Sequence, residues 1–159
     1  MDDTRAPLDL IDRDILARLQ VQARITNTQL AQDIGLSPAS TLERVRKLER
    51  SGLIKSYRAR LAPEKLGLHM HLMVQVKLQS STTSHVSKFK QVVAQLPEVV
   101  TCYQLVGNAD FLIEIYVPDL AAYQELVMHK LSAIEGVQHV TPSIVTDTLK
   151  EAGLSVAST

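Results

Sequence analysis

A tight turn between a helix-ending and a helix-starting signal constrains this 159-residue chain more than any other feature. Gly35 favours the left-handed conformation that ends a helix. Ser37 and Pro38 have the preferences of an N-cap and a first helical residue, so a new helix begins two residues later. Before the turn, Thr26 followed by Gln29 matches a capping box and predicts a short helix from Asn27 to Ile34. Two helices joined in this way form a helix-turn-helix.

A further helix is expected before this pair and a small β element after it. Asp9 has the preference of an N-cap, and apolar residues at three- and four-residue spacing predict a helix from Leu10 to about Gln22. The helix after the turn is expected to run from Pro38 to about Ser51, with an inner stripe of Leu42, Val45 and Leu48. Residues 53–61 then predict a short β element, which completes a winged helix-turn-helix over residues 1–62.

Basic residues gather on the helix that follows the turn. The segment from Ser37 to Arg60 contains seven Lys/Arg and two Asp/Glu, in a chain whose formal net charge is zero. An α-helix fits the major groove of DNA, where its N-terminal side chains reach base edges and flanking cations neutralise phosphates. Arg44 is expected on the free face as the base reader; the alternative is a plain helical bundle with a solvated basic face. The candidate DNA-binding residues are Ser37, Ser40, Thr41, Glu43, Arg44, Lys47, Arg50, Lys55 and Arg58.

The remaining residues, 63–159, predict a βαββαβ domain. Alternation and helical periodicity indicate a strand, a helix, two strands, a helix and a last strand. That order is ferredoxin-like, and the whole chain is therefore expected to be α+β. The third strand is apolar on both faces and is expected at the centre of the sheet, while Pro142 favours an edge position for the last strand. The expected ranges are 69–78, 86–96, 99–106, 110–117, 119–134 and 137–148.

One face of this sheet has no helix to cover it, because right-handed crossovers place both helices on the other face. An open apolar sheet face is typical of an interface, and a domain of this size gains stability from self-association. We therefore expect the protein to be at least a dimer. The candidate interface residues are Met73, Leu112 and Tyr116.

The chain contains five motifs that together carry a resemblance: Leu8-Asp9-x-x-Asp12-x-x-Ile15-Leu16, Gly35-Leu36-Ser37-Pro38, Arg44-Val45-Arg46-Lys47-Leu48-Glu49, Ser51-Gly52-Leu53-Ile54 and Gly107-x-x-Asp110. With these motifs the chain resembles the Lrp/AsnC family of transcriptional regulators over residues 8–151. The resemblance implies bacterial or archaeal regulators that dimerise through ferredoxin-like domains, often assemble into octamers, and bind small effectors, usually amino acids, between dimers. Glu43 stands where many members carry Arg; its carboxylate can accept from cytosine but repels phosphate.

The turn Gly107-Asn108-Ala109-Asp110 is the candidate effector site. A ligand can approach the backbone of Gly107 closely, and Asp110 offers a carboxylate to an ammonium group. Tyr103 and Leu105 could shape the side-chain pocket. By resemblance, Thr141, Ser143 and Thr146 on the last strand of a neighbouring dimer would help to close the site. The alternative is a plain hairpin turn in which Asp110 caps backbone amides.

The sequence favours a sequence-specific regulator that responds to an amino acid over other functions. The chain lacks the common hydrolase, phosphate-loop and zinc-protease motifs, so an enzyme is not expected. His69 and His71 share a strand face and could form a metal pair, although a solvated or interface pair is favoured, and Cys102 is expected to be an apolar filler. No metal and no cofactor besides the effector are expected. An effector-sensing module that does not contact DNA, or a family member without an effector, remain the alternatives.

The sequence also predicts where the protein works. A single cysteine excludes an internal disulfide, and no apolar run approaches the length of a membrane helix. The first five residues lack the features of a secretory leader. A cytoplasmic protein whose partners are double-stranded DNA, further copies of itself and a small amino acid is therefore expected.

Overall fold

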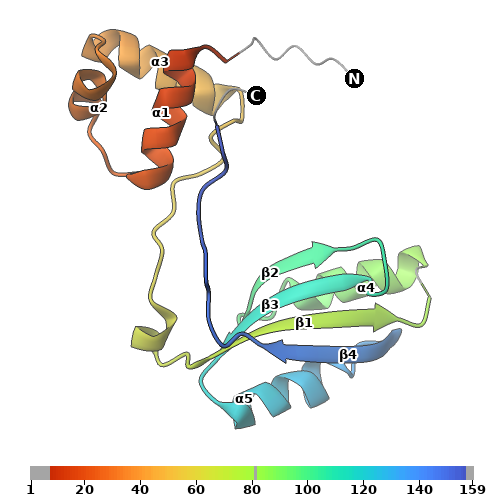
Figure 1. The fold of residues 1–159 in the computed structure, drawn as a ribbon. Coiled ribbons are helices and arrows are strands. Elements are labelled where there is room, and N and C mark those ends of the chain that lie inside the picture. The colour runs from red at the N-terminus through yellow and green to blue at the C-terminus, as the bar shows by residue number, and fades with distance from the viewer. Residues whose placement is uncertain (1–7, 81, 157–159) are drawn as a thin grey trace. The chain divides into compact units, whose positions relative to one another are not determined.

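The computed structural model describes residues 8–80 and 82–156 (Figure 1). They form two compact units, residues 8–60 with 150–156, and residues 61–149. The sequence division at residues 62 and 63 assigned the tail to the second domain, whereas the structure groups 150–156 with the first. The assessment of a leader concerns residues 1–5, which lie outside the described residues. Within the described ranges, none of the helices has the length and apolar character needed to span a bilayer.

The first unit contains the three predicted helices, α1 (Leu10–Val21), α2 (Asn27–Ile34) and α3 (Pro38–Arg50). The side-chain caps predicted from local sequence are all formed, which is why the helix starts agree with the sequence. Gly35 has a φ of 71° and ends α2, as expected from its left-handed preference. The caps are Asp9, Thr26 and Ser37, which accept hydrogen bonds from the backbone N–H groups of Asp12, Gln29 and Ser40.

The core of the first unit is small and includes Ile15 of α1, Leu30 of α2 and Leu48 of α3. Leu42 was predicted to be part of it, but its side chain is 38% exposed. The predicted β element over residues 53–61 is also wrong, since these residues are neither strand nor helix in the structure. Residues 53–54 are bends, and residues 55–61 form a connection without regular secondary structure.

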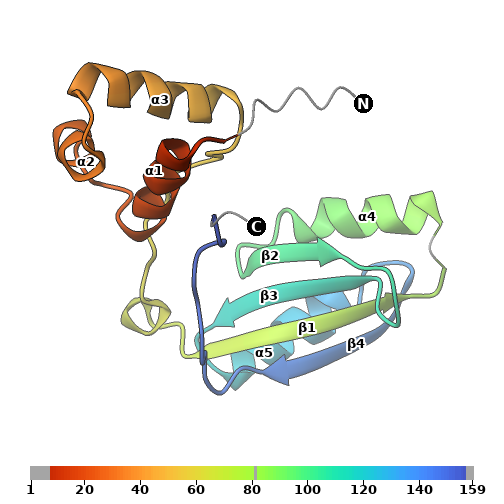
Figure 2. The same cartoon turned by 45° about the horizontal axis from the view of Figure 1, so that its top comes forward.

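The second unit has the βαββαβ order predicted from the sequence. Its four strands form one antiparallel sheet in the order β2-β3-β1-β4, which is the ferredoxin-like arrangement (Figure 2). β3 lies inside the sheet and β4 at its edge, as predicted. The elements are the 3₁₀ turn η1 (Pro63–Leu66), β1 (Met70–Leu78), α4 (Thr83–Val93), β2 (Val99–Gln104), β3 (Phe111–Val117), α5 (Leu120–Glu125), its π-helical continuation η2 (Leu126–Leu131) and β4 (Val137–Ile144).

Both helical segments pack on the same face of the sheet, where they enclose the core (Figures 1 and 2). Phe89 of α4 stacks on Phe111 of β3 with ring centroids 4.3 Å apart. On the two central strands, β1 and β3, most residues of this face are almost completely buried, and their neighbours along each strand point to the opposite face. We call that opposite face, which none of the described elements of residues 61–149 covers, the open face. Its residues include His71, Met73, Gln75, Thr101, Tyr103, Leu112, Glu114, Tyr116, Thr141 and Ser143.

Candidate functional site

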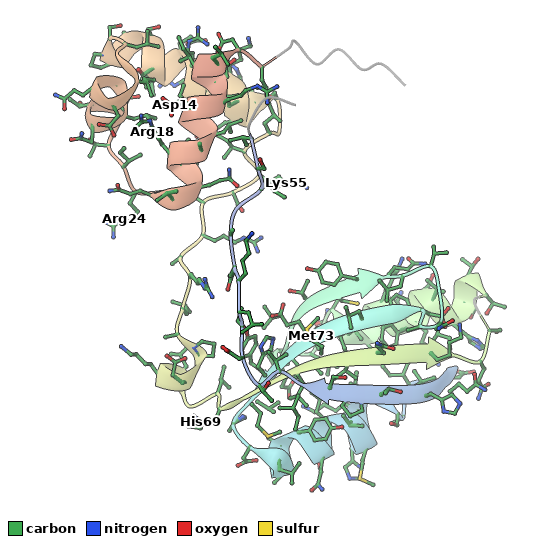
Figure 3. All side chains as sticks on the ribbon, viewed as in Figure 1. Asp14, Arg18, Arg24, Lys55, His69 and Met73 are labelled. Carbon is green, nitrogen blue, oxygen red and sulfur yellow. The ribbon has the colours of Figure 1, made fainter. Side chains whose placement is uncertain are left out.

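The exposed surface of α3 carries most of the candidate DNA-binding residues. Ser37 and Ser40 lie at its N-terminal end, and Glu43, Lys47 and Arg50 follow along the exposed side. Lys55 and Arg58 are exposed on the connection after α3, where Figure 3 labels Lys55. The structure therefore keeps these residues accessible to a large partner.

Thr41 does not belong to this surface. Its side chain is completely buried, and its hydroxyl donates a hydrogen bond of 3.0 Å to the backbone carbonyl of Ser37. The prediction that Thr41 contacts DNA is wrong, because α3 packs through Thr41 and Leu48 instead of through Leu42.

Arg44 was predicted to lie free on the outer face and is instead tied to α1. One guanidinium nitrogen, Nη1, lies 2.7 Å from a carboxylate oxygen of Asp9 and 2.7 Å from one of Asp12. The Asp12 side chain is only 6% exposed. Hydrogen bonds to Asp9 and then to Asp12 raise the pKa of Arg44 further above its ordinary value. The pKa of Asp9 is lowered, first by the backbone N–H of Asp12 and then by Arg44. Arg44 thus holds α3 against α1.

The same helix phase exposes Arg46, which the sequence analysis left out of its candidates. Arg46, Lys47 and Arg50 form a cationic row on the exposed side of α3. Arg50 is paired with Glu43 at 3.0 Å, and both side chains are about two-thirds exposed. An exposed pair of this kind contributes little stability and can rearrange when a phosphate approaches. Helical periodicity centred on Thr41 and Leu48 would have found Arg46.

Backbone hydrogen bonds hold the effector loop, residues 105–110. The N–H of Leu105 donates to the carbonyl of Asp110 at 2.8 Å, and the N–H of Asp110 donates to the carbonyl of Val76 in β1 at 2.9 Å. Ala109 is buried, while Gly107 and Asn108 are exposed. Gly107 has a φ of 151°, a conformation that other residues rarely adopt. The loop therefore presents backbone groups and the Asn108 amide to solvent.

Asp110 has a structural role in this loop. Its carboxylate accepts a hydrogen bond of 2.8 Å from the backbone N–H of Leu78 and lies 3.3 Å from the ammonium of Lys77. The side chain is 15% exposed. Within one chain this carboxylate thus binds a backbone amide, as in the alternative of a capping aspartate, and lies beside a lysine. The predicted contact of Asp110 with a ligand ammonium group stays a prediction.

The two halves of the predicted effector site lie apart within one chain. Tyr103 of β2 and Thr141 of β4 occupy the same row of the open face, with Leu112 and Gln75 between them. Three strand spacings of about 4.8 Å separate Tyr103 from Thr141, roughly 14 Å in all. Ser143 lies one row further along β4, and Thr146 is exposed beyond its end. One chain therefore does not gather these residues around a ligand the size of an amino acid.

A polar cluster that the sequence did not indicate lies on the open face. The Glu114 carboxylate accepts from the Thr101 hydroxyl at 2.9 Å and lies 3.0 Å from Nε2 of His71. The rings of His71 and Tyr116 are stacked, with centroids 4.3 Å apart. The predicted interface residues Met73, Leu112 and Tyr116 surround this cluster and are half-buried; Figure 3 labels Met73 on β1.

The sequence also left open a metal pair at His69 and His71 and predicted Cys102 to be an apolar filler. Among the described residues, no group of three or more His, Cys, Asp or Glu is arranged to hold a metal ion. His71 is engaged with Glu114. Cys102 lies at the edge strand β2, and burial raises the pKa of its thiol, which makes it a poorer nucleophile.

Comparison with known proteins identifies both units. A model of the winged helix-turn-helix DNA-binding domain matches residues 8–55, and a model of the Lrp/AsnC ligand binding domain matches residues 71–154. The leucine-responsive regulatory protein of Escherichia coli is 36% identical over 152 residues, which cover 96% of this chain and 93% of the relative.

Solved structures agree with this comparison. A transcriptional regulator from Neisseria meningitidis, solved as a complex with L-Met, is 32% identical and has a TM-score of 0.88, with 92% of this chain and 94% of the other covered. An AsnC family transcriptional regulator from Agrobacterium tumefaciens is 30% identical, with a TM-score of 0.85 and coverages of 93% and 96%. The similarity thus spans both units.

Proposed function

This chain belongs to the Lrp/AsnC family of DNA-binding transcriptional regulators, and from that premise we propose which residues carry its function. It binds operator DNA through the exposed side of α3, as an oligomer built on the open face, and an amino acid bound between copies controls its assembly. The observation that carries this proposal is the separation, within one chain, of the two halves of the effector site. A protein with this function works in the cytoplasm, where the DNA is.

The DNA contacts divide into two groups. Ser37, Ser40 and Glu43 belong to the N-terminal part of α3, which reaches base edges when a recognition helix enters the major groove. The cations contact phosphates and set the register of the complex. These cations are Arg46, Lys47, Arg50, Lys55 and Arg58.

The open face is the proposed contact between two copies of the chain. It combines half-buried apolar residues with the Glu114 cluster, and none of the described elements of residues 61–149 shields it. A two-fold dimer carries two DNA-binding units and reads a pseudo-palindromic site, with half-sites about one helical turn, or a multiple of a turn, apart. Further assembly into octamers is proposed on the resemblance to the family.

The effector site needs the loop of one copy and the last strand of another. Gly107 and Asn108 supply exposed oxygen acceptors for a ligand ammonium group, and Tyr103 and Leu105 supply apolar surface. Hydroxyls of Thr141, Ser143 and Thr146 from a second copy suit the ligand carboxylate. The L-Met complex of the Neisseria relative supports an amino acid as the ligand. Asp110 supports the loop.

Isothermal titration with the twenty amino acids tests this arrangement. We expect at least one to bind the wild type and to lose its heat in Asn108→Ala and in Thr141→Val. When the two variants are mixed and allowed to exchange subunits, some sites combine an intact loop with an intact strand, so part of the heat returns. No return of heat would place both residues in one chain's site, and no binding by any amino acid would remove the effector.

An electrophoretic shift on the DNA upstream of the protein's own gene tests the DNA-binding part. The wild type is expected to form a discrete complex, and the amino acid found by titration is expected to change its size or affinity, because a ligand favours the assembly that binds it better. If the wild type bound this DNA no better than unrelated DNA, the DNA upstream of its own gene would not be its operator.

A further inference from the structure

The residues 150–156 lie along α1 and are held mainly through their backbone. Nη1 of Arg13 donates a hydrogen bond of 3.0 Å to the carbonyl of Val156, and Nε2 of Gln20 donates one of 3.0 Å to the carbonyl of Leu154. A third contact comes from the connection after α3, where Arg60 pairs with Glu151. The tail thus contacts two elements of the DNA-binding unit.

The two donors on α1 lie on one face of the helix. Residues seven positions apart are separated by about two turns and point in nearly the same direction. Ile15, which is completely buried in the core, lies on the opposite side. The tail therefore follows the outer face of α1 and adds nothing to the core.

Little apolar surface holds the tail in place. The side chain of Leu154 is 85% exposed, and the acceptors on the tail are two main-chain carbonyls. One part-buried hydrogen bond, one exposed hydrogen bond and one exposed ion pair each contribute modestly to stability. The docked state is consequently easy to release.

The position of the tail gives the chain a second connection between its units. The chain leaves the DNA-binding unit after residue 60 and returns to it at residue 150. β4 ends at Ile144, so only residues 145–149 separate the strand from the docked tail. Five residues span at most about 17 Å when fully extended. The strand that carries Thr141 and Ser143 is thus joined to α1 by a short segment.

We propose that residues 150–156 form a latch, a reversible second attachment of the DNA-binding unit to the ligand-binding domain. With the first connection alone, the DNA-binding units of an oligomer reorient independently. The latch restricts this freedom, so that two units meet two half-sites at a smaller entropic cost. The latch also links the movement of β4 to α1, a consequence that rests on the proposed function of β4 in effector binding.

Three variants, two at α1 and one beyond its end, test the latch in the full chain. Arg13→Met/Gln20→Glu removes both donors and places a carboxylate against the Leu154 carbonyl. Arg13→Lys keeps a donor and serves as the conservative variant. Arg24→Ala removes an exposed arginine of the same unit and serves as the control. Circular dichroism checks that all three keep the wild-type fold.

Docking is measured by limited trypsin digestion after Lys150, which lies at the start of the latch. We expect slow cleavage in the wild type, Arg13→Lys and Arg24→Ala, and cleavage about tenfold faster in Arg13→Met/Gln20→Glu, since proteolysis follows the population of the open state. Equal cleavage rates in all four proteins would overturn the docking of the tail.

The effect of docking is measured with two DNA duplexes, one with both half-sites and one with a single half-site. Arg13→Met/Gln20→Glu is expected to bind the duplex with two half-sites about tenfold more weakly than the wild type, which is within the usual range of coupling between sites. On the duplex with a single half-site, its affinity is expected to equal that of the wild type. Equal losses on both duplexes, or no loss on either, would overturn the second attachment. If the wild type bound no DNA, the proposed function would fail, and digestion would still decide whether the tail docks.

Discussion

Thr41 and Arg44 are neighbours on one side of α3, and both face into the DNA-binding unit. Thr41 satisfies its hydroxyl within its own helix, while Arg44 neutralises two carboxylates of α1. An arginine held by two carboxylates has little positive field left for DNA. Arg44, which the sequence predicted to read bases, therefore stabilises the packing of the recognition helix α3.

Arg44→Met is expected to lower the free energy of unfolding of the DNA-binding unit by about 1–3 kcal/mol, because it leaves the buried Asp12 carboxylate without its partner. Chemical denaturation followed by circular dichroism measures this loss. Arg46→Met is the matched control and is expected to leave stability unchanged. Equal stability of the two variants would contradict the role assigned to Arg44.

The pKa of Asp9 gives an independent test of the contact between Asp9 and Arg44. Asp9 has a lowered pKa, so its contribution to stability is present above its ordinary value of 3.8 and is lost as the pH falls through the lower folded pKa. A carboxyl titration by NMR is expected to place Asp9 below its ordinary pKa in the wild type. In Arg44→Met the pKa rises part of the way back, because the hydrogen bond from the Asp12 backbone remains.

Asp110→Ala is expected to destabilise the ligand-binding domain by about 1–3 kcal/mol, since the backbone N–H of Leu78 loses its acceptor. Thermal unfolding measures the change. Asn108→Ala, which alters an exposed side chain two residues away, is expected to keep the wild-type midpoint. A destabilised Asn108→Ala with an unaffected Asp110→Ala would reverse the two assignments.

At the scale of the element, α3 shows what local sequence decides. Its start at Ser37 and Pro38 and the turn at Gly35 depend on caps and a backbone preference within a few residues, and the sequence predicted all of them. Its rotation depends on which side chains α1 and α2 bury. The apolar Leu42 predicts a core position that the structure does not show. A helix rotated to bury Leu42 places Thr41 and Arg44 on the exposed side, where neither lies, and gives no signal for the exposed Arg46.

The cationic row of α3 makes a prediction of its own. Arg46→Ala and Lys47→Ala are each expected to weaken binding to all DNA sequences to a similar degree and to reduce the salt slope by about one unit. Binding isotherms at several salt concentrations measure the slope. A variant that lost affinity for the operator alone, with an unchanged slope, would be a base contact and not a phosphate contact.

At the scale of the whole molecule, the alternation of the strands predicted the sheet and its open face. The candidates Met73, Leu112 and Tyr116 all lie on that face, because strand periodicity alone fixes which residues share a side. The Glu114 cluster and the docking of the tail could not be predicted in this way. They bring together residues from separate strands or from opposite ends of the chain, and no local pattern records such contacts.

Leu112→Asp tests the open face as the contact between copies. Leu112 lies opposite Gln75 in the middle of the face and is not part of the helix-side core. The added charge is expected to shift the protein to a monomer at micromolar concentration, as measured by light scattering, with circular dichroism reporting whether the fold is kept. Gln75→Ala serves as the control on the same face. A folded Leu112→Asp protein of wild-type mass would contradict the proposed interface.

The docking of the tail on α1 also sets an order of events during synthesis. At a translation rate of about 5–20 residues per second, residues 154–156 are made roughly 10 s after α1. In that interval the three helices and the whole βαββαβ domain are synthesised, because all of them precede the tail in the sequence. Until the tail follows, the outer face of α1 has no tail to bind. A nascent or prematurely terminated chain therefore displays a folded recognition helix without its second attachment. The second attachment forms only after residues 150–156 have been synthesised and have docked on α1.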